Sequence, residues 1–97
     1  MPARRIDNFL ELWKWEEKIE IGSNVIVRWT SSGYDFHTTA RVTKLNRKSI
    51  CVCLTDGVPG TNPGFEWDYP AGQTIRVPRI DTPEWSWNNG VFPAELL

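Results

Sequence analysis

Two β-branched runs in the middle of the chain constrain the fold most strongly. Residues 40–45 and 50–54 are rich in apolar residues at alternating positions, and a polar Asn-Arg-Lys turn at 46–48 separates them. An Asp56-Gly57 pair closes the second run. Alternating strand formers bounded by turn residues are typical of a β-hairpin. We therefore expect an antiparallel hairpin with a basic tip, a unit from which small curled sheets and barrels are built.

The hairpin has two plausible registers, which differ in the residues that form its tip. A three-residue tip of Arg47, Lys48 and Ser49 puts the apolar residues of both runs on one face. A two-residue tip would set Arg41 opposite Leu54. We favour the three-residue tip, because a slip by one residue moves the whole apolar set to the other face of the strand. The expected inward residues, including those of the preceding strand, are Val25, Val27, Val42, Ile50, Val52 and Leu54.

The flanking segments predict further elements. Residues 7–18 have the spacing of a helix, with Leu10 and Trp13 on the face expected to dock on the rest of the protein. Residues 24–30 and 74–77 alternate as strands.

Turn formers dominate the remainder of the carboxy-terminal half. Gly and Pro pairs recur through residues 56–72, and this stretch also holds a short aromatic run, 65–69, which we interpret as an edge strand or a binding loop. Residues 82–85 resemble a capped single helical turn.

Length and composition restrict the class of protein. A chain of 97 residues is expected to form one domain. It contains no apolar run near the roughly 18 residues of a membrane span, and its first residues do not resemble a signal peptide. Cys51 and Cys53 are one residue apart on a predicted strand, a poor geometry for a disulfide. We expect a soluble cytoplasmic protein with free thiols.

Charge is divided unevenly along the chain although the net charge is only −1. Residues 1–22 carry −1, residues 23–55 carry +4 and residues 56–97 carry −4. A net charge near zero argues against a protein whose main function is to bind phosphate backbones non-specifically. The central strands are nevertheless the positive part of the molecule.

The strand pattern resembles the Src-homology-3-like small barrels of the Tudor and KOW kind. The resemblance covers residues 22–80 and depends on the valines that follow Gly22, on the hairpin at 40–54 and on the strand at 75–77. It implies a mainly β fold, a small antiparallel barrel of about five strands. Residues 1–21 would add an amino-terminal helix and residues 81–97 a Trp-rich extension.

The same resemblance implies a function class. Members of this fold family are mostly non-catalytic modules that bind nucleic acid, modified or proline-rich peptides, or larger assemblies. The acidic carboxy-terminal half departs from a typical KOW module, which argues against RNA binding of the ribosomal kind.

The residues that support catalysis do not form a recognisable set. His37 is the single histidine and has no nucleophile motif near it in the sequence. Together with Cys51 and Cys53 it could supply at most three ligands, whereas a closed structural zinc site takes four. The glycines lack the phosphate-loop pattern. We therefore expect no enzyme activity, no cofactor and no metal.

Aromatic residues give the first candidate site. Six tryptophans are more than the interior of a small barrel can hold. By resemblance to Tudor-like barrels, which place aromatic cages for methylated lysine or arginine at strand ends, the candidate pocket consists of Trp29, Tyr34, Phe36, Trp67 and Tyr69. Asp35, Glu66 and Asp68 would supply nearby acids for a cation. The alternative is that Trp29, Phe36 and Trp67 only complete the core.

Basic residues give the second candidate site. They are Arg28, Arg41, Lys44, Arg47 and Lys48. Such a set could follow a phosphate backbone while a neighbouring ring stacks on a base. The alternative is a solvated turn, because Lys and Arg are common at hairpin tips.

Taken together, the sequence predicts a non-enzymatic interaction module of a bacterial or phage cytoplasm that binds a protein or peptide partner through an aromatic and acidic surface. One form of this prediction is a homo-oligomer that forms through Trp13, Trp15, Trp85 or Trp87. Nucleic-acid binding through the basic hairpin is the alternative function, and no membrane partner is expected.

Overall fold

The computed structural model describes residues 9–60 and 67–93. Within them it contains a helix, α1 (Phe9–Lys18), and strands that follow it along the chain. The strands are β1 (Asn24–Ser31), β2 (Tyr34–Leu45), β3 (Ser49–Leu54), β4 (Val58–Pro59), β5 (Trp67–Tyr69), β6 (Thr74–Pro78) and β7 (Gly90–Pro93). The prediction of a mainly β fold with an amino-terminal helix is confirmed.

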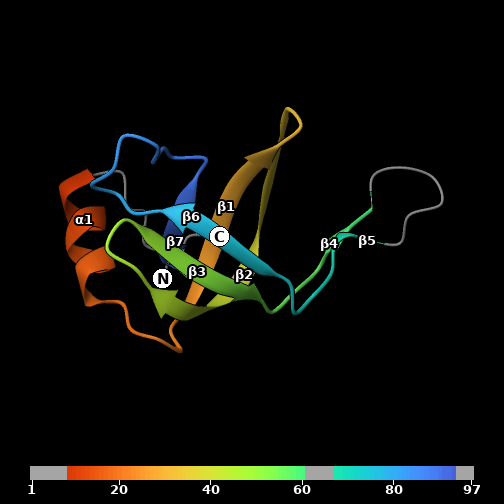
Figure 1. Ribbon diagram of the computed structural model, residues 1–97, viewed down its shortest axis with the longest axis horizontal. Helices are drawn as coiled ribbons and strands as arrows, with labels where there is room; N and C mark the ends of the chain where they lie inside the picture. Colours follow the sequence, from red (N-terminus) through yellow and green to blue (C-terminus); the bar gives the residue numbers. More distant parts are fainter. Residues whose placement is uncertain (1–8, 61–66, 94–97) are drawn as a thin grey trace, which may run out of the picture.

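Five of these strands form one antiparallel sheet in the order β6-β3-β2-β1-β7. The sheet curls into a half-barrel, and α1 lies at one end of the molecule (Figure 1). The short strands β4 and β5 pair separately and project from the opposite end. Strand β7 comes from the Trp-rich segment 81–97, so that segment contributes an edge strand to the sheet.

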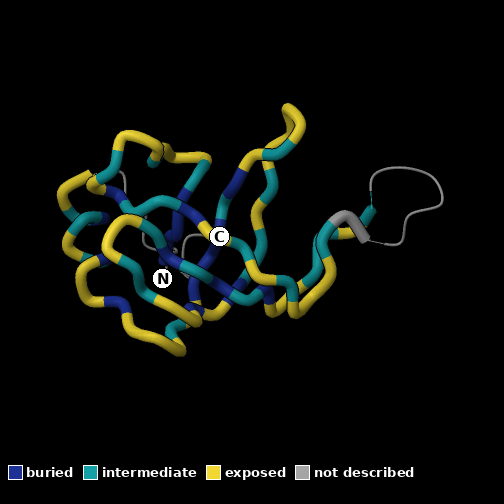
Figure 2. The backbone as a smooth tube through the Cα atoms, viewed as in Figure 1, coloured by how far each residue is buried: buried dark blue, intermediate teal, exposed yellow. Residues whose placement is uncertain are grey.

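The concave face of the sheet forms the main core. All six residues predicted to point inward are at most 2% exposed, from Val25 on β1 to Leu54 on β3. Val77 on β6 and Val91 on β7 complete this face from the two edges. Buried backbone accordingly runs through the middle of the sheet, whereas the turns and α1 are largely exposed (Figure 2).

A β-bulge near the hairpin tip explains how this face is kept. Between Ala40 and Val42 the pairing is Ala40 with Leu54 and Val42 with Val52, but beyond the bulge Lys44 pairs with Cys51. The predicted three-residue tip is therefore wrong: Leu45 pairs with Ile50 and the Asn46 N–H bonds to the Ser49 carbonyl, so the tip is the two-residue alternative of Arg47 and Lys48. The inward face that was predicted is nevertheless correct. An extra residue, Thr43, absorbs the one-residue slip that would otherwise turn the apolar side chains outward.

Helix α1 packs on the convex face of the sheet, where it builds a second, smaller core. Leu12 is 1% exposed and lies in one cluster with Ile26 of β1, Phe92 of β7 and Ile80. The predicted docking face is correct for Trp13, which packs on this cluster, and wrong for Leu10, which is 60% exposed. The buried positions of the helix are Leu12 and Glu16. Burial of Glu16 depends on partners far away in the sequence, and the helical periodicity of residues 7–18 cannot predict such partners.

The segment after β6 contains turns and no second helix among the described residues. The predicted helical turn at 82–85 is a pair of hydrogen-bonded turns, in which Thr82 donates its hydroxyl to the Arg79 carbonyl at 2.7 Å. In the part of the chain described, the helix is too short and too polar to cross a membrane.

Candidate functional site

Three of the predicted pocket residues meet at the end of the half-barrel, and we call Trp29, Phe36 and Tyr69 the inner aromatic cluster. Trp29 and Phe36 are cross-strand partners on β1 and β2, with ring centroids 5.6 Å apart, and Tyr69 of β5 lies 5.0 Å from Trp29 and 5.1 Å from Phe36. Trp29 is only 6% exposed. Rings at these separations contact one another, as aromatic pairs in cores do.

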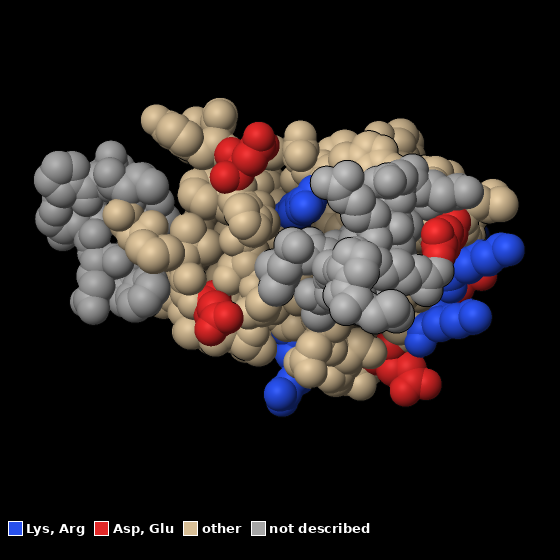
Figure 3. Space-filling view, turned by 180° about the vertical axis from the view of Figure 1, so that it is seen from behind, with Lys and Arg blue, Asp and Glu red and all other residues tan. Residues whose placement is uncertain are grey.

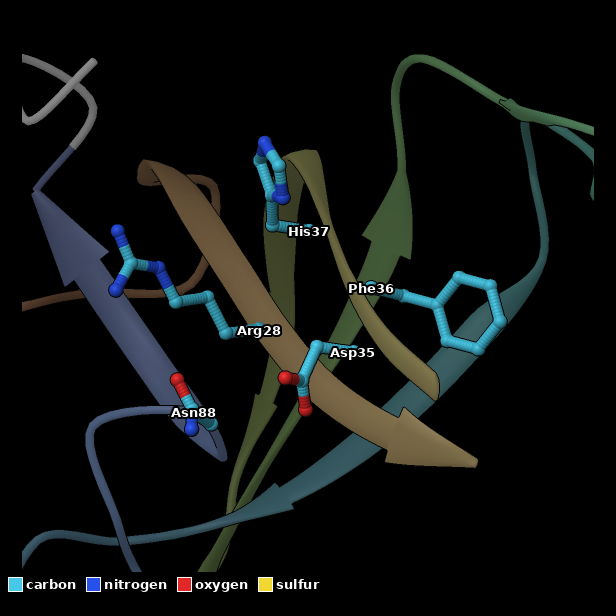
Figure 4. Close-up of a pocket in the computed structure, with 5 residues that line it drawn as sticks. All are labelled: Arg28, Asp35, Phe36, His37 and Asn88. Atoms are coloured by element: carbon cyan, nitrogen blue, oxygen red, sulfur yellow. The ribbon is translucent and has the colours of Figure 1, made fainter. Parts of the chain in front are cut away.

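Of the other predicted pocket residues, Tyr34 does not join the inner cluster. Tyr34 is 66% exposed at the start of β2, beside the turn that ends β1. Glu66 and the side chains of Trp67 and Asp68 lie outside what the structure describes. Asp35 is exposed, and it points to the opposite side of β2 from Phe36 (Figure 4). The inner cluster is thus suited to packing, with Tyr34 apart from it.

A second group of rings gathers on the convex face, and we call Phe9, Trp13, Trp85, Trp87 and Phe92 the outer aromatic cluster. Phe9 lies 5.7 Å from both Trp13 and Trp85, and Trp85 lies 5.3 Å from Trp87. Both tryptophans also contact Phe92, at 6.1 Å. The cluster therefore joins the first turn of α1, the 85–89 turn and β7 into one continuous aromatic surface.

The outer cluster is partly open to solvent. Phe9 is 42% exposed and Trp87 is 41% exposed, while Phe92 beneath them is 1% exposed. Trp85 lies directly across Gly90, where a Cβ atom would stand 2.7 Å from Trp85 Cδ1. The absence of a side chain at position 90 is what lets this indole lie flat against β7.

Arg28 belongs to the outer cluster and not to the hairpin tip. Its guanidinium lies 4.9 Å from the Phe92 ring centroid, and its Nη1 donates a hydrogen bond to the Trp87 carbonyl at 3.3 Å. A cation over an aromatic face is attracted by the ring quadrupole. The fold therefore separates Arg28 from the other predicted phosphate-binding residues.

The remaining basic residues are spread over β2 and the β2–β3 turn. Arg41 and Lys44 are exposed on β2, and Arg47 and Lys48 are exposed in the turn. Arg47 and Lys48 line a groove of about 380 Å³ whose other wall contains Asp81 and Glu84. On the face seen in Figure 3, acidic and basic side chains are interspersed. The tip is thus a mixed-charge surface.

A small polar pocket of about 110 Å³ lies on the outer face of β1 and β2. Arg28, Asp35, His37 and Asn88 line it, with Phe36 at its margin. Arg28 and His37 are cross-strand partners and project to the same side of the sheet, whereas the Phe36 ring points away from it (Figure 4). Because Asn88 follows Trp87, the pocket adjoins the outer aromatic cluster.

Glu16 is a buried acid, 3% exposed, and it was not anticipated from the sequence. It accepts hydrogen bonds from the Ile80 backbone N–H at 3.0 Å and from Arg79 Nε at 3.2 Å. Arg79 also donates to the Asn46 carbonyl at 3.1 Å. Burial raises the pKa of Glu16, and the bonds from Ile80 and Arg79 oppose that shift. These bonds fasten α1 to the loop after β6, a structural role.

The outer aromatic cluster was only partly visible in the sequence. Its tryptophans were expected to form a contact surface, but their convergence with Phe9 and Arg28 was not predicted. The available signal was the Trp-x-Trp pair just before the turn and strand that carry Phe92. Such a pair indicates a shared face only once the segment is known to be extended.

Within residues 9–60 and 67–93 no three His, Cys, Asp or Glu side chains are placed to hold a metal ion. Cys51 and Cys53 are half-buried free thiols on β3. Comparison with protein-family models, curated proteins and solved structures finds no match to this chain.

Proposed function

We propose that this protein is a non-enzymatic interaction module that binds a protein partner through the outer aromatic cluster. The observation that carries the proposal is the exposure of Phe9 and Trp87, at 42% and 41%, on top of a fully buried Phe92. Large rings held on a rigid base lose little conformational entropy on binding. Trp and Arg are also the residues most enriched at interface hot spots.

The arrangement favours this cluster over the inner one as the binding surface. The inner rings already contact one another, and Trp29 is 6% exposed. In the outer cluster, one side of Trp87 stacks on Phe92, and 41% of the residue is accessible. A partner that covers Trp87 and Phe9 would remove apolar surface from water at about 25 cal/mol per Å².

Nucleic-acid binding has less support. Arg28 lies in the outer aromatic cluster, apart from the hairpin tip, and Arg47 and Lys48 share their groove with Asp81 and Glu84. A phosphate backbone placed there would meet carboxylates as well as cations. A gel shift that weakens steeply with salt and is lost in the R47E/K48E double variant would favour nucleic acid over protein as the partner.

The test compares two surface variants of equal kind. The F9S/W87S double variant removes the two exposed rings of the outer cluster, whereas Y34S removes a ring elsewhere that is more exposed than either of them. Light scattering over a concentration series tests a second copy of the chain as partner. Quantitative affinity capture from the native host, followed by titration of each purified candidate, tests other proteins.

We expect F9S/W87S to lose the complex, whether the partner is a second copy of the chain or another protein. Y34S should keep it. Urea denaturation of both variants checks that the fold survives. Complexes of equal strength with both variants would refute the proposal, as would a chain that stays monomeric and yields no titratable partner.

A further inference from the structure

We infer that the polar pocket beside Trp87 binds a carboxylate group, carried by the partner that docks on the outer aromatic cluster. This inference rests on the proposed function and names the chemistry of the partner. The pocket has a volume of about 110 Å³ and is lined by a guanidinium, an imidazole, an amide and one carboxylate. That volume is large enough to hold a carboxylate group.

Arg28 is the residue that would bind the carboxylate. Its guanidinium is held from one side by the Phe92 ring at 4.9 Å and by the Trp87 carbonyl, which occupies Nη1. The remaining N–H groups of a guanidinium form a planar fork that matches the two oxygens of a carboxylate. Because the side chain is already fixed, little rotamer entropy is lost when the ligand binds.

His37 and Asn88 would supply further donors. His37 lies directly opposite Arg28 on β2, and Asn88 faces Arg28 from the 85–89 turn (Figure 4). Within the described chain, the side chains of His37 and Asn88 make no hydrogen bond to another residue, so their polar atoms are free to meet a ligand. Three side chains that carry hydrogen-bond donors thus line the same small pocket.

Asp35 adds a negative charge to the pocket. It lines the same pocket, and within the described structure it lies beyond ion-pair distance of Arg28. Its charge repels any anion that binds there, while the charge of Arg28 attracts it. Asp35 therefore weakens the binding of a carboxylate, which is the anionic group that an unmodified protein partner carries.

The position of the pocket links it to the aromatic surface. Asn88 follows Trp87 in sequence, and the Trp87 carbonyl itself holds Arg28. A partner segment that places an apolar residue against Trp87 therefore brings its next polar group to the pocket. An acidic side chain and a chain carboxyl terminus present the same chemistry here.

The first experiment titrates the whole protein with sodium acetate and records ¹H–¹⁵N NMR shifts of Arg28 Nε–H and of the Asn88 backbone amide. Acetamide at the same concentrations is the neutral control. We expect saturable shifts with acetate alone. R28Q should weaken acetate binding about tenfold or more, because it removes a charge-assisted hydrogen-bonding pair. K44Q removes an exposed cation elsewhere on β2 and should leave acetate binding unchanged.

D35N separates this pocket from non-specific attraction. Loss of the repelling charge should tighten acetate binding by about threefold to fivefold. Equal shifts with acetamide, an unchanged affinity in R28Q, or weaker binding in D35N would each overturn the inference. Chemical shifts away from the pocket verify that the fold of R28Q and D35N is intact.

Two short probes distinguish the sources of the carboxylate. N-acetyl-glycyl-aspartic diamide carries only a side-chain carboxylate, and N-acetyl-diglycine carries only a chain terminus. Tighter, Arg28-dependent binding of one probe than of acetate identifies the source. If neither exceeds acetate, a partner-borne carboxylate is ruled out. If the wild-type protein forms the Trp87-dependent complex but does not bind acetate, only the carboxylate pocket is refuted. If the protein forms no Trp87-dependent complex, the proposed function is refuted.

Discussion

The carboxylate of Glu16 in α1 accepts a hydrogen bond from the backbone N–H of Ile80, which lies 64 residues further along the chain, at 3.0 Å. The same carboxylate binds Arg79 Nε at 3.2 Å. Through Arg79, whose backbone N–H also bonds to the Lys48 carbonyl, the helix is connected to the β2–β3 turn. One buried acid therefore joins three segments that are remote in sequence.

Substitution E16A should lower the free energy of unfolding by about 2–3 kcal/mol, because it leaves the Ile80 N–H and the partly buried Arg79 without their acceptor. Urea denaturation measures the loss. E20A, which removes an exposed acid just beyond the helix, is the matched control and should change stability by less than about 0.5 kcal/mol. A loss as small in E16A as in E20A would contradict the assigned role.

Stability should also depend on pH through Glu16. Burial raises the pKa of Glu16 above the usual 4.5. The folded chain therefore binds a proton on the Glu16 carboxyl group more tightly than the unfolded chain does. The resulting stabilisation is complete below pH 4.5 and is lost as the pH rises through the raised pKa of the folded state. The stability of the wild type relative to E16Q should therefore increase as the pH falls from neutral toward 4.5. A difference that does not vary with pH would rule out a raised pKa.

Gly90 and Trp85 should be energetically coupled. A methyl group at position 90 would stand 2.7 Å from Trp85 Cδ1, so G90A should cost about 1–3 kcal/mol through overpacking. In a W85A background the same change should cost less than about 0.5 kcal/mol, since the space is then open. A double-mutant cycle measured by thermal or urea unfolding gives the coupling, and additive losses would disprove the contact.

The inner aromatic cluster should contribute to stability, and Tyr34 should not. W29A removes a 6% exposed ring that contacts Phe36 and Tyr69, and it should cost about 3–5 kcal/mol. Y34A removes a 66% exposed ring and should stay within about 0.5 kcal/mol of the wild type. Comparable losses in the two variants would show that Tyr34 packs with the others.

Periodicity was enough to predict the inward face of the sheet but not the pairing that produces it. Val42 and Val52 were expected on the same face, and they are direct partners. The bulge at Thr43 could not be predicted, because its benefit appears only when both strands are placed against the core. Local alternation therefore predicts which residues are buried better than it predicts register.

The convex face was harder to predict because it depends on distant segments. Leu10 had the helical spacing of a docking residue but is exposed, while Leu12 meets Ile26 and Phe92. Glu16 is buried only because Arg79 and Ile80 approach it from the other half of the chain. The Trp85–Trp87 segment likewise acquires its role from β7 and Arg28. None of these relationships leaves a periodic signal.

The strand order has a consequence for synthesis of the chain. Strand β1 lies between β2 and β7, and α1 packs on Phe92 of β7. A nascent polypeptide that emerges amino end first thus cannot bury Leu12 and Ile26 until Phe92 has left the ribosome. Until then, the apolar convex side of β1 remains open to chaperones.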